Sequence, residues 1–128
     1  MPESRFILDT NSVIFLTTKG NIIPSDLLDE FNNAELFISV ISEIELLSKP
    51  TLSKEEEEKL RAFFSDRISI INITNSIKEK TIELRRTKIL KLPDCIIAAT
   101  AIDLDAVLIT NDLQLLNISL PDFKAKAF

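Results

Sequence analysis

The sequence predicts an α/β fold in which a central parallel sheet of four to five strands lies between two layers of helices. Short apolar segments alternate along the chain with longer segments of helical periodicity. The short segments are apolar at almost every position, which is typical of parallel strands buried on both faces. The chain has 128 residues, so we expect a single domain over residues 1–128.

Four strands are expected where apolar and β-branched residues run together, and one further segment is a candidate fifth strand. The carboxyl ends of parallel strands meet at one edge of the sheet, which is where ligands bind in open α/β folds. The expected strands are Arg5–Asp9, Glu35–Val40, Arg67–Ile73 and Ala106–Thr110, with Leu115–Ile118 as the candidate fifth.

Helices are expected between these strands, and several begin at residues that cap helices. Ser53 and Glu56 have the spacing of a capping box. The helix that begins at Pro93 is apolar on nearly all sides, so it should be buried. The expected helices follow Thr10–Ser12 and Pro24–Asp26, and then cover Ser42–Ser48, Ser53–Phe64, Asn75–Leu90 and Pro93–Asp103.

Residue types that are rare or absent exclude several kinds of site. There is no histidine, so neither a Ser-His-Asp triad nor an HExxH zinc site can form. Gly20 is the single glycine, which excludes a glycine-rich phosphate loop, and Cys95 is the single cysteine, which excludes an internal disulfide. The net charge of −5 argues against nucleic-acid binding through bulk electrostatics. Any chemistry must therefore rest on carboxylates, amides, hydroxyls, Lys and Arg.

Acidic residues from four segments map to the carboxyl edge of the predicted sheet. Asp9 ends the first strand, Glu45 lies early in the helix after the second strand, and Asp112 follows the fourth. Only a short link joins the helix that begins near Asp94 to the fourth strand, so the two must run antiparallel. Asp94 is therefore expected beside Asp112.

Each acid also has an ordinary structural interpretation. Asp9 could stop a strand, Asp112 could cap a turn, and Asp94 suits a helix N-terminus. Glu45 has capping-box spacing with Ser42. Their joint placement is harder to explain in this way, because carboxylates at one edge repel each other unless a cation neutralises them. A cluster of hard oxygen ligands suits Mg²⁺ or Mn²⁺.

The segments that carry these acids follow one another in a characteristic order. They are FILDTNSVIFL (Phe6–Leu16), ISVISEIELLS (Ile38–Ser48), LKLPDCIIAATAI (Leu90–Ile102) and AVLITNDLQL (Ala106–Leu115). Together they resemble the motifs of the PIN-domain nucleases, and among these the compact VapC-type toxins of toxin–antitoxin pairs. The resemblance spans nearly the whole chain, and it implies a Rossmann-like three-layer sandwich whose four acids are both metal ligands and catalytic residues.

The resemblance also assigns roles to neighbouring residues. Asn11 and Thr110 would be polar supports of the ion site, and Asn111 could contribute in place of Asp112. Cys95 stands where the family usually has a small residue such as Ala. We expect Cys95 to be buried and not to bind the metal.

The activity that the resemblance implies is hydrolysis of RNA by an endoribonuclease that uses Mg²⁺ or Mn²⁺. Its role would be that of the toxin in a type II toxin–antitoxin pair, with a small antitoxin as partner. It also implies a homodimer formed through helix faces. Candidate contacts, for each of which core burial is the simpler role, are Leu27, Leu28, Phe63 and Phe64. Because the chain has no Trp or Tyr, any stacking on RNA bases must come from Phe.

Basic residues that precede Asp94 form a candidate RNA-binding rim, which would offset the acidic net charge locally. The alternative is a solvated helix end whose basic residues favour the helix dipole. The residues are Arg85, Arg86, Lys88 and Lys91.

Other readings of the sequence remain open. A catalytically silent PIN-like binding domain and a PIN nuclease of RNA processing are alternatives within the resemblance. A receiver domain would need an acidic pair near the first strand, and a phosphatase with a nucleophilic Asp usually has Asp-x-Asp, but Asp9-Thr10-Asn11 supplies neither.

No apolar stretch reaches the roughly 20 residues of a membrane helix, and no signal peptide is evident, so we expect a cytoplasmic protein without a membrane partner.

Overall fold

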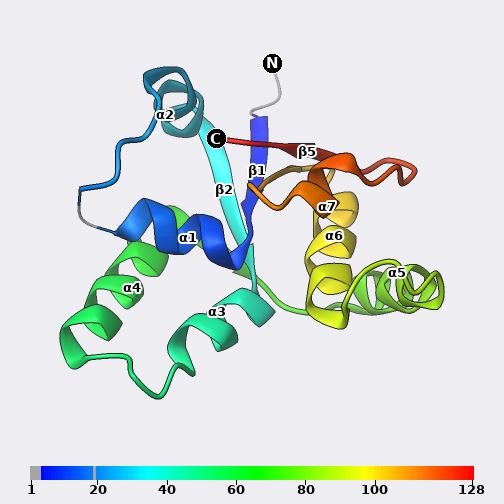
Figure 1. Cartoon of the computed structure of the whole chain (residues 1–128), viewed down its shortest axis with the longest axis horizontal. Coiled ribbons are helices and arrows are strands. Elements are labelled where there is room, and N and C mark those ends of the chain that lie inside the picture. Colours follow the sequence, from blue (N-terminus) through cyan, green and yellow to red (C-terminus); the bar gives the residue numbers. More distant parts are fainter. Residues whose placement is uncertain (1–3, 19) are drawn as a thin grey trace.

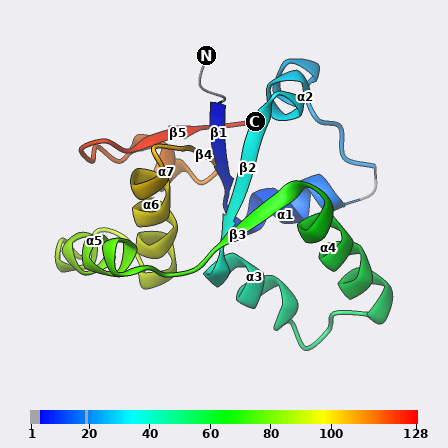
Figure 2. The same ribbon diagram turned by 180° about the vertical axis from the view of Figure 1, so that it is seen from behind.

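The structure, a computed structural model, describes residues 4–18 and 20–128, which form a three-layer α/β sandwich (Figure 1, Figure 2). Its central sheet is parallel, with the strand order β3-β2-β1-β4-β5. The predicted fold class is therefore confirmed. The strands are β1 (Ser4–Leu8), β2 (Ala34–Ser39), β3 (Ile68–Ile71), β4 (Val107–Ile109) and β5 (Lys124–Lys126).

Helices cover both faces of this sheet, and each layer buries its own hydrophobic cluster (Figure 1). The first layer consists of α1 (Thr10–Thr17), α2 (Ser25–Asn32), α3 (Val40–Leu47) and α4 (Lys54–Arg67). The second layer consists of α5 (Asn75–Arg86), α6 (Leu92–Leu104) and α7 (Leu113–Asn117).

Neighbouring residues of the central strands point to opposite faces, and both sets are buried. In β1, Phe6 and Leu8 belong to the cluster beneath α1–α4, whereas Ile7 belongs to the cluster beneath α5–α7. In β4, Ile109 and Leu108 divide between the two clusters in the same way. This two-sided burial explains why the strands are apolar at consecutive positions.

The expectation of a fifth strand at Leu115–Ile118 is wrong. Most of this segment forms α7, where Leu115 is buried and Ile118 packs against the same cluster, at the i, i+3 spacing of one helix face. The fifth strand is β5, which pairs in parallel with β4. Its sequence, Lys-Ala-Lys, has no apolar run because β5 is an edge strand, where lysines hinder pairing with another chain.

Several helix boundaries differ from the prediction, and in two helices local backbone effects explain the difference. α3 begins ahead of the predicted Ser42, since Ser39 caps it by accepting the N–H of Ile41 at 3.1 Å. α5 ends before the predicted Leu90, and Lys88 follows with a left-handed φ of 61° that cannot continue a helix.

Hydrogen bonds and burial test several smaller expectations. The capping box of α4 is present, because Ser53 Oγ accepts the N–H of Glu56 at 3.1 Å and Glu56 Oε1 accepts the N–H of Ser53 at 3.0 Å. Cys95 is fully buried, as expected. Leu27 and Phe64, candidate dimer contacts for which core burial was the simpler interpretation, are core residues that are 4% and 5% exposed. In the part of the chain that the structure describes, no helix has the length and apolar character needed to cross a membrane.

Candidate functional site

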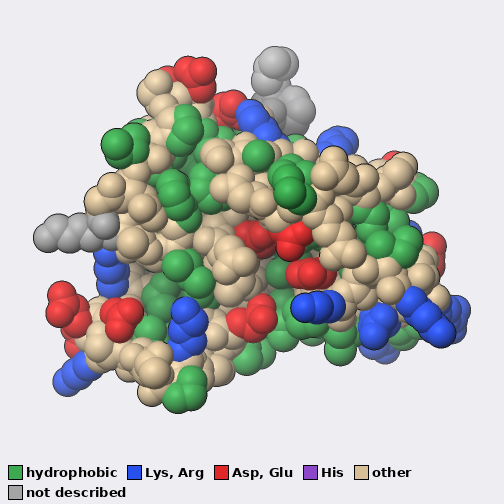
Figure 3. Space-filling model, viewed as in Figure 1, with side chains coloured by type: hydrophobic (Ala, Val, Ile, Leu, Met, Phe, Trp, Pro, Cys, Tyr) green, Lys and Arg blue, Asp and Glu red, His purple; other side chains and the backbone are tan. Residues whose placement is uncertain are grey.

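The acids singled out from the sequence line one cavity at the carboxyl edge of the sheet. Asp9, Glu45, Asp94 and Asp112 all border this cavity of about 170 Å³. Figure 3 shows acidic side chains gathered in a hollow near the middle of the molecular surface. The predicted convergence is therefore present in the fold, whereas the roles of these residues stay predictions. We call this the four-acid cavity.

Helix N-termini place three of the acids at the cavity. Asp9 caps α1 and accepts the N–H of Ser12 at 2.7 Å. Asp112 caps α7 and accepts the N–H of Gln114 at 2.8 Å, and Asp94 lies in the first turn of α6. Asp9 directly follows β1, as its structural interpretation expected, and it also caps α1, whereas Asp112 caps a helix and not merely a turn. The partial positive charge at these helix ends eases the crowding of negative charge.

Asp9 is the most firmly held of the acids. It is 7% exposed, and its second oxygen, Oδ2, accepts a hydrogen bond from the Thr110 hydroxyl. Thr110 is fully buried, and its Oγ1 also accepts the N–H of Asp112 at 3.0 Å. Ser12 reinforces this corner by donating to the Ile109 carbonyl at 2.8 Å. These bonds connect the ends of β1 and β4 and fix the orientation of the Asp9 carboxylate.

Glu45 is held from α1. The Thr10 hydroxyl donates to Glu45 Oε1 at 2.9 Å and lies 3.1 Å from the hydroxyl oxygen of the buried Ser42. Ser39, and not Ser42, caps α3, so the capping-box interpretation of Glu45 is wrong. The carboxylate of Glu45 is therefore available to the four-acid cavity.

Negative charge from the other acids acts on Asp94. Burial raises the pKa of the Asp94 carboxyl, the charges of Asp112, Asp9 and Glu45 raise it further, and Lys91 lowers it. Within residues 4–18 and 20–128, however, no three acidic side chains are placed closely enough to share one metal ion. The donor set suits a hard divalent cation in charge and chemistry, but the side chains would have to move to surround one.

The polar residues expected to support the site divide into two groups. Asn11 lines the four-acid cavity and Thr110 contacts Asp9, as expected of supports. Asn111 does not line that cavity, and its Oδ1 accepts the N–H of Phe128 at 3.1 Å. Sequence reasoning did not find the roles of the Thr10, Ser12 and Ser42 hydroxyls. Two features of the sequence could have indicated these roles. They are the polar residues that follow Asp9, and Ser42, which precedes Glu45 by one helical turn.

The predicted basic rim lies on the α5–α6 side of the site. Arg85 and Arg86 end α5, Lys88 lies in the link, and Lys91 caps α6. All are exposed, and none forms an ion pair with another residue in the described part of the chain. Lys91 is near enough to Asp94 to lower its pKa. Figure 3 shows basic side chains between the acidic hollow and α5.

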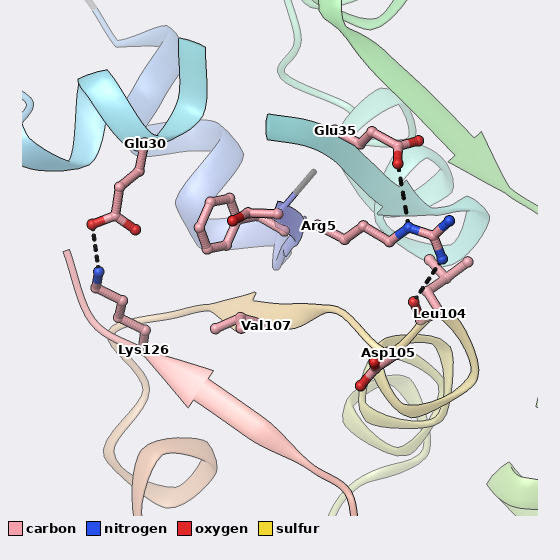
Figure 4. Close-up of a pocket in the computed structure, with 9 residues that line it drawn as sticks. Arg5, Glu30, Glu35, Leu104, Asp105, Val107 and Lys126 are labelled. Carbon is pink, nitrogen blue, oxygen red and sulfur yellow. Dashed lines mark hydrogen bonds and ion pairs between the residues drawn. The ribbon is translucent and has the colours of Figure 1, made fainter. Parts of the chain in front are cut away.

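A larger cavity lies elsewhere, at the amino edge of the sheet (Figure 4). It has a volume of about 790 Å³ and is lined from the first residues of β1, β2 and β4. Its charges are already paired, since Arg5 Nε lies 3.3 Å from Glu35 Oε1 and Lys126 Nζ lies 2.8 Å from Glu30 Oε1. The smaller four-acid cavity is the better candidate because none of its acids forms an ion pair with another described residue.

The fold and the four-acid cavity define a Rossmann-like α/β protein with a carboxylate site at the carboxyl edge of its sheet. The sequence model of the PIN domain matches residues 6–119. The chain therefore belongs to the PIN-domain family, as the sequence motifs indicated. No curated protein matches the sequence.

Solved structures similar to this chain include VapBC proteins and a toxin–antitoxin complex. VapBC2 from Rickettsia felis, bound to a DNA fragment from its promoter, is 26% identical, with a TM-score of 0.76 over 96% of this chain and 98% of that chain. A toxin–antitoxin complex from Klebsiella pneumoniae is 30% identical, with a TM-score of 0.68 over 91% and 93%. DNA-bound VapBC from Salmonella typhimurium is 23% identical, with a TM-score of 0.75 over 97% and 98%. These likenesses confirm the expected VapC-type PIN fold.

Proposed function

We propose that this chain is a divalent-metal-dependent endoribonuclease that hydrolyses RNA phosphodiester bonds. The observation that supports it is the convergence of Asp9, Glu45, Asp94 and Asp112 on one cavity of a PIN fold. Mutually repelling carboxylates cost stability, so their convergence favours a function that uses their charge. Membership of a family of nucleases supports phosphodiester hydrolysis as that function.

Mg²⁺ or Mn²⁺ fits the donor set, because the cavity offers carboxylate oxygens and no imidazole or thiolate. The four acids would hold the ion. When bound, such an ion neutralises charge on the phosphate and makes a bound water more acidic. The raised pKa of Asp94 reflects the excess of negative charge that an ion would relieve.

The protein's own groups would position the reacting atoms. Thr110 and a backbone N–H of α1 hold the two oxygens of Asp9, and Thr10 holds Glu45. Because these bonds exist before RNA arrives, Asp9 and Glu45 are already oriented by the protein itself. Either Glu45 or Asp94 would accept the proton of the attacking water.

The basic rim would bind RNA phosphates beside the four-acid cavity. Its side chains are exposed and unpaired within the described residues, and they lie next to Asp94 in the chain. A local strip of this kind can attract RNA although the net charge of the chain is −5.

We further propose that the chain is the toxin of a type II pair, with a small antitoxin as partner. The solved structures similar to it are toxin–antitoxin complexes. An antitoxin could silence the site by placing a basic side chain against the carboxylates. The proposed homodimer would use Leu28, which is 43% exposed, in place of the buried Leu27 and Phe64. Light scattering tests the dimer, and a monomeric mass at working concentration contradicts it.

The nuclease proposal is tested by comparing Asp9→Asn with Asp29→Asn, which changes an exposed acid on α2. Wild type and Asp29→Asn should cleave RNA in Mg²⁺ or Mn²⁺, and Asp9→Asn should not, while circular dichroism shows the same fold. Full activity of Asp9→Asn would remove Asp9 from the site. A wild-type protein that cleaves no RNA and takes up neither ion in calorimetry would favour the non-catalytic binding domain.

The toxin role is tested separately by expression without a partner. Wild type should arrest growth and Asp9→Asn should not. Active enzyme that leaves growth unchanged would favour a nuclease of RNA processing.

The basic rim is tested by reversing charge at Arg85 and Arg86. This change should weaken RNA binding and reduce its dependence on salt, because fewer counterions are released. The same reversal at Lys54 and Lys59 on α4 is the control. If both variants bind RNA with the same affinity and the same dependence on salt, the basic residues form only a solvated helix end.

A further inference from the structure

We propose that a second cavity, next to the four acids, binds an unpaired nucleobase of the RNA and thereby selects the base beside the cleaved phosphate. The proposal rests on the nuclease function and adds a recognition site to it. The cavity has a volume of about 280 Å³. It is lined by Asn11, Ser12, Phe15, Asn111, Asp112 and Phe128, and we call it the aromatic cavity.

The aromatic cavity adjoins the four-acid cavity. Asn11 and Asp112 line both of them, so the two share a wall formed at the ends of β1 and β4. A nucleotide whose base enters the aromatic cavity therefore carries its phosphate to the edge of the carboxylate site. Base recognition and cleavage would then concern adjacent positions of the same RNA strand.

Two aromatic rings supply a surface for a base. The rings of Phe15 and Phe128 meet edge to face, with centroids 4.7 Å apart and planes at 60°, and both residues are partly exposed. The buried phenylalanines belong to the core; they are Phe6, Phe31, Phe37 and Phe64. Bases stack on aromatic side chains in proteins that bind single strands. The aromatic cavity is thus where this chain, without Trp or Tyr, offers rings beside the acids.

Two asparagine side chains can form hydrogen bonds that orient a base in the aromatic cavity. The Asn11 side chain has no hydrogen-bond partner among the described residues, and Asn111 uses only its Oδ1, to accept the N–H of Phe128. Asn side chains pair well with the donors and acceptors at base edges. A purely apolar peptide side chain would leave these amides unpaired, and a phosphate would be repelled by Asp112. The chemistry of the aromatic cavity therefore fits a base, and Asn111 belongs to recognition and not to the metal site.

The test uses hairpin RNAs with a randomised loop, cleaved in Mg²⁺ and sequenced at the cut ends. Wild type should favour certain bases at one position next to the cut. Phe128→Leu and Phe15→Leu should each flatten that preference and lower kcat/KM on the favoured hairpin by about fivefold or more, since base stacking is lost. Phe123→Leu is the matched control, because Phe123 precedes β5 and packs against the second core cluster.

An abasic residue at the favoured position separates recognition from a structural effect. It should slow wild type to the rate of Phe128→Leu, and the variant should lose nothing further. Two results would overturn the base site and leave the nuclease function intact. Phe128→Leu could cleave the intact and the abasic hairpin more slowly than wild type by the same factor, or it could keep the base preference of wild type. Wild type that cuts without any preference would do the same. Wild type that cuts no RNA would refute the nuclease function and the base site together. If Phe128→Leu fails to fold, Phe15→Leu and the abasic RNA decide.

Discussion

Replacing Thr110 with Val should destabilise the protein more than loss of a single ordinary hydrogen bond. The Thr110 hydroxyl donates to Asp9 and accepts the N–H of Asp112, and the residue is fully buried. Val has nearly the same shape, so the change removes the two hydrogen bonds and leaves two polar groups without this partner.

The size of the effect follows from the two partners. A hydrogen bond to a charged group contributes about 1.5–3 kcal/mol and one between neutral groups about 0.5–1.5 kcal/mol. For Thr110→Val we therefore expect a loss of about 2–4 kcal/mol in the free energy of unfolding of metal-free protein. With a denaturant slope of about 2 kcal/mol/M, the urea midpoint falls by about 1–2 M.

Urea titrations of Thr110→Val and Thr100→Val provide the assay. Thr100 is also buried, but its hydroxyl donates to the Ile96 carbonyl at 2.7 Å, a group that the α6 helix also uses. The control should therefore lose less than about 1 kcal/mol. If Thr110→Val loses no more than Thr100→Val, the conclusion that Thr110 anchors Asp9 is refuted. Under the proposed function, Thr110→Val also lowers kcat more than it changes KM.

Three further predictions concern the acids and a helix cap. Because folding raises the pKa of Asp94, the folded protein holds that proton more tightly, and stability is lost as pH rises through the interval between the unfolded and folded pKa values. Without divalent ions, Asp94→Asn should thus gain stability relative to wild type as the pH rises above about 4, the ordinary pKa of Asp, as measured in urea; a constant difference would contradict this. Mg²⁺ or Mn²⁺ at 100 times its Kd should stabilise wild type by about 2.7 kcal/mol in scanning calorimetry. Asp9→Asn should gain less, and an equal gain would place the ion elsewhere. Ser53→Ala removes the cap of α4 and should cost about 1 kcal/mol in urea unfolding without changing RNA cleavage; an unchanged midpoint would show that the cap is dispensable.

The fold could be predicted where burial leaves a pattern in the sequence. Strands β1, β2 and β4 are apolar at consecutive positions because both faces are covered, and the structure confirms them. β5 could not be found, since an exposed edge strand needs no apolar residues. Periodicity also fails to separate a core from an interface, which is why Leu27 and Phe64 were candidates for both, and the structure places them in the core.

The candidate site could be predicted where the order and direction of the helices and strands alone determine which residues meet. The short link between α6 and β4 places Asp94 beside Asp112, and the charge of Asp112 does act on Asp94. The hydroxyl contacts were not predictable, because they join residues far apart in the chain. Thr10 reaches Ser42 across 32 positions and Ser12 reaches Ile109 across 97, which no local spacing reveals.

The paired charges around the amino-edge cavity have a consequence for how a polyanion meets this molecule. Arg5 and Lys126 are engaged with carboxylates, so that pole exerts little net pull on RNA. At the other pole, cations such as Arg85 and Arg86 are free of such partners among the described residues. Under the proposed function, once an ion offsets the four acids, these unpaired cations would draw RNA toward the carboxyl end of the sheet before contact.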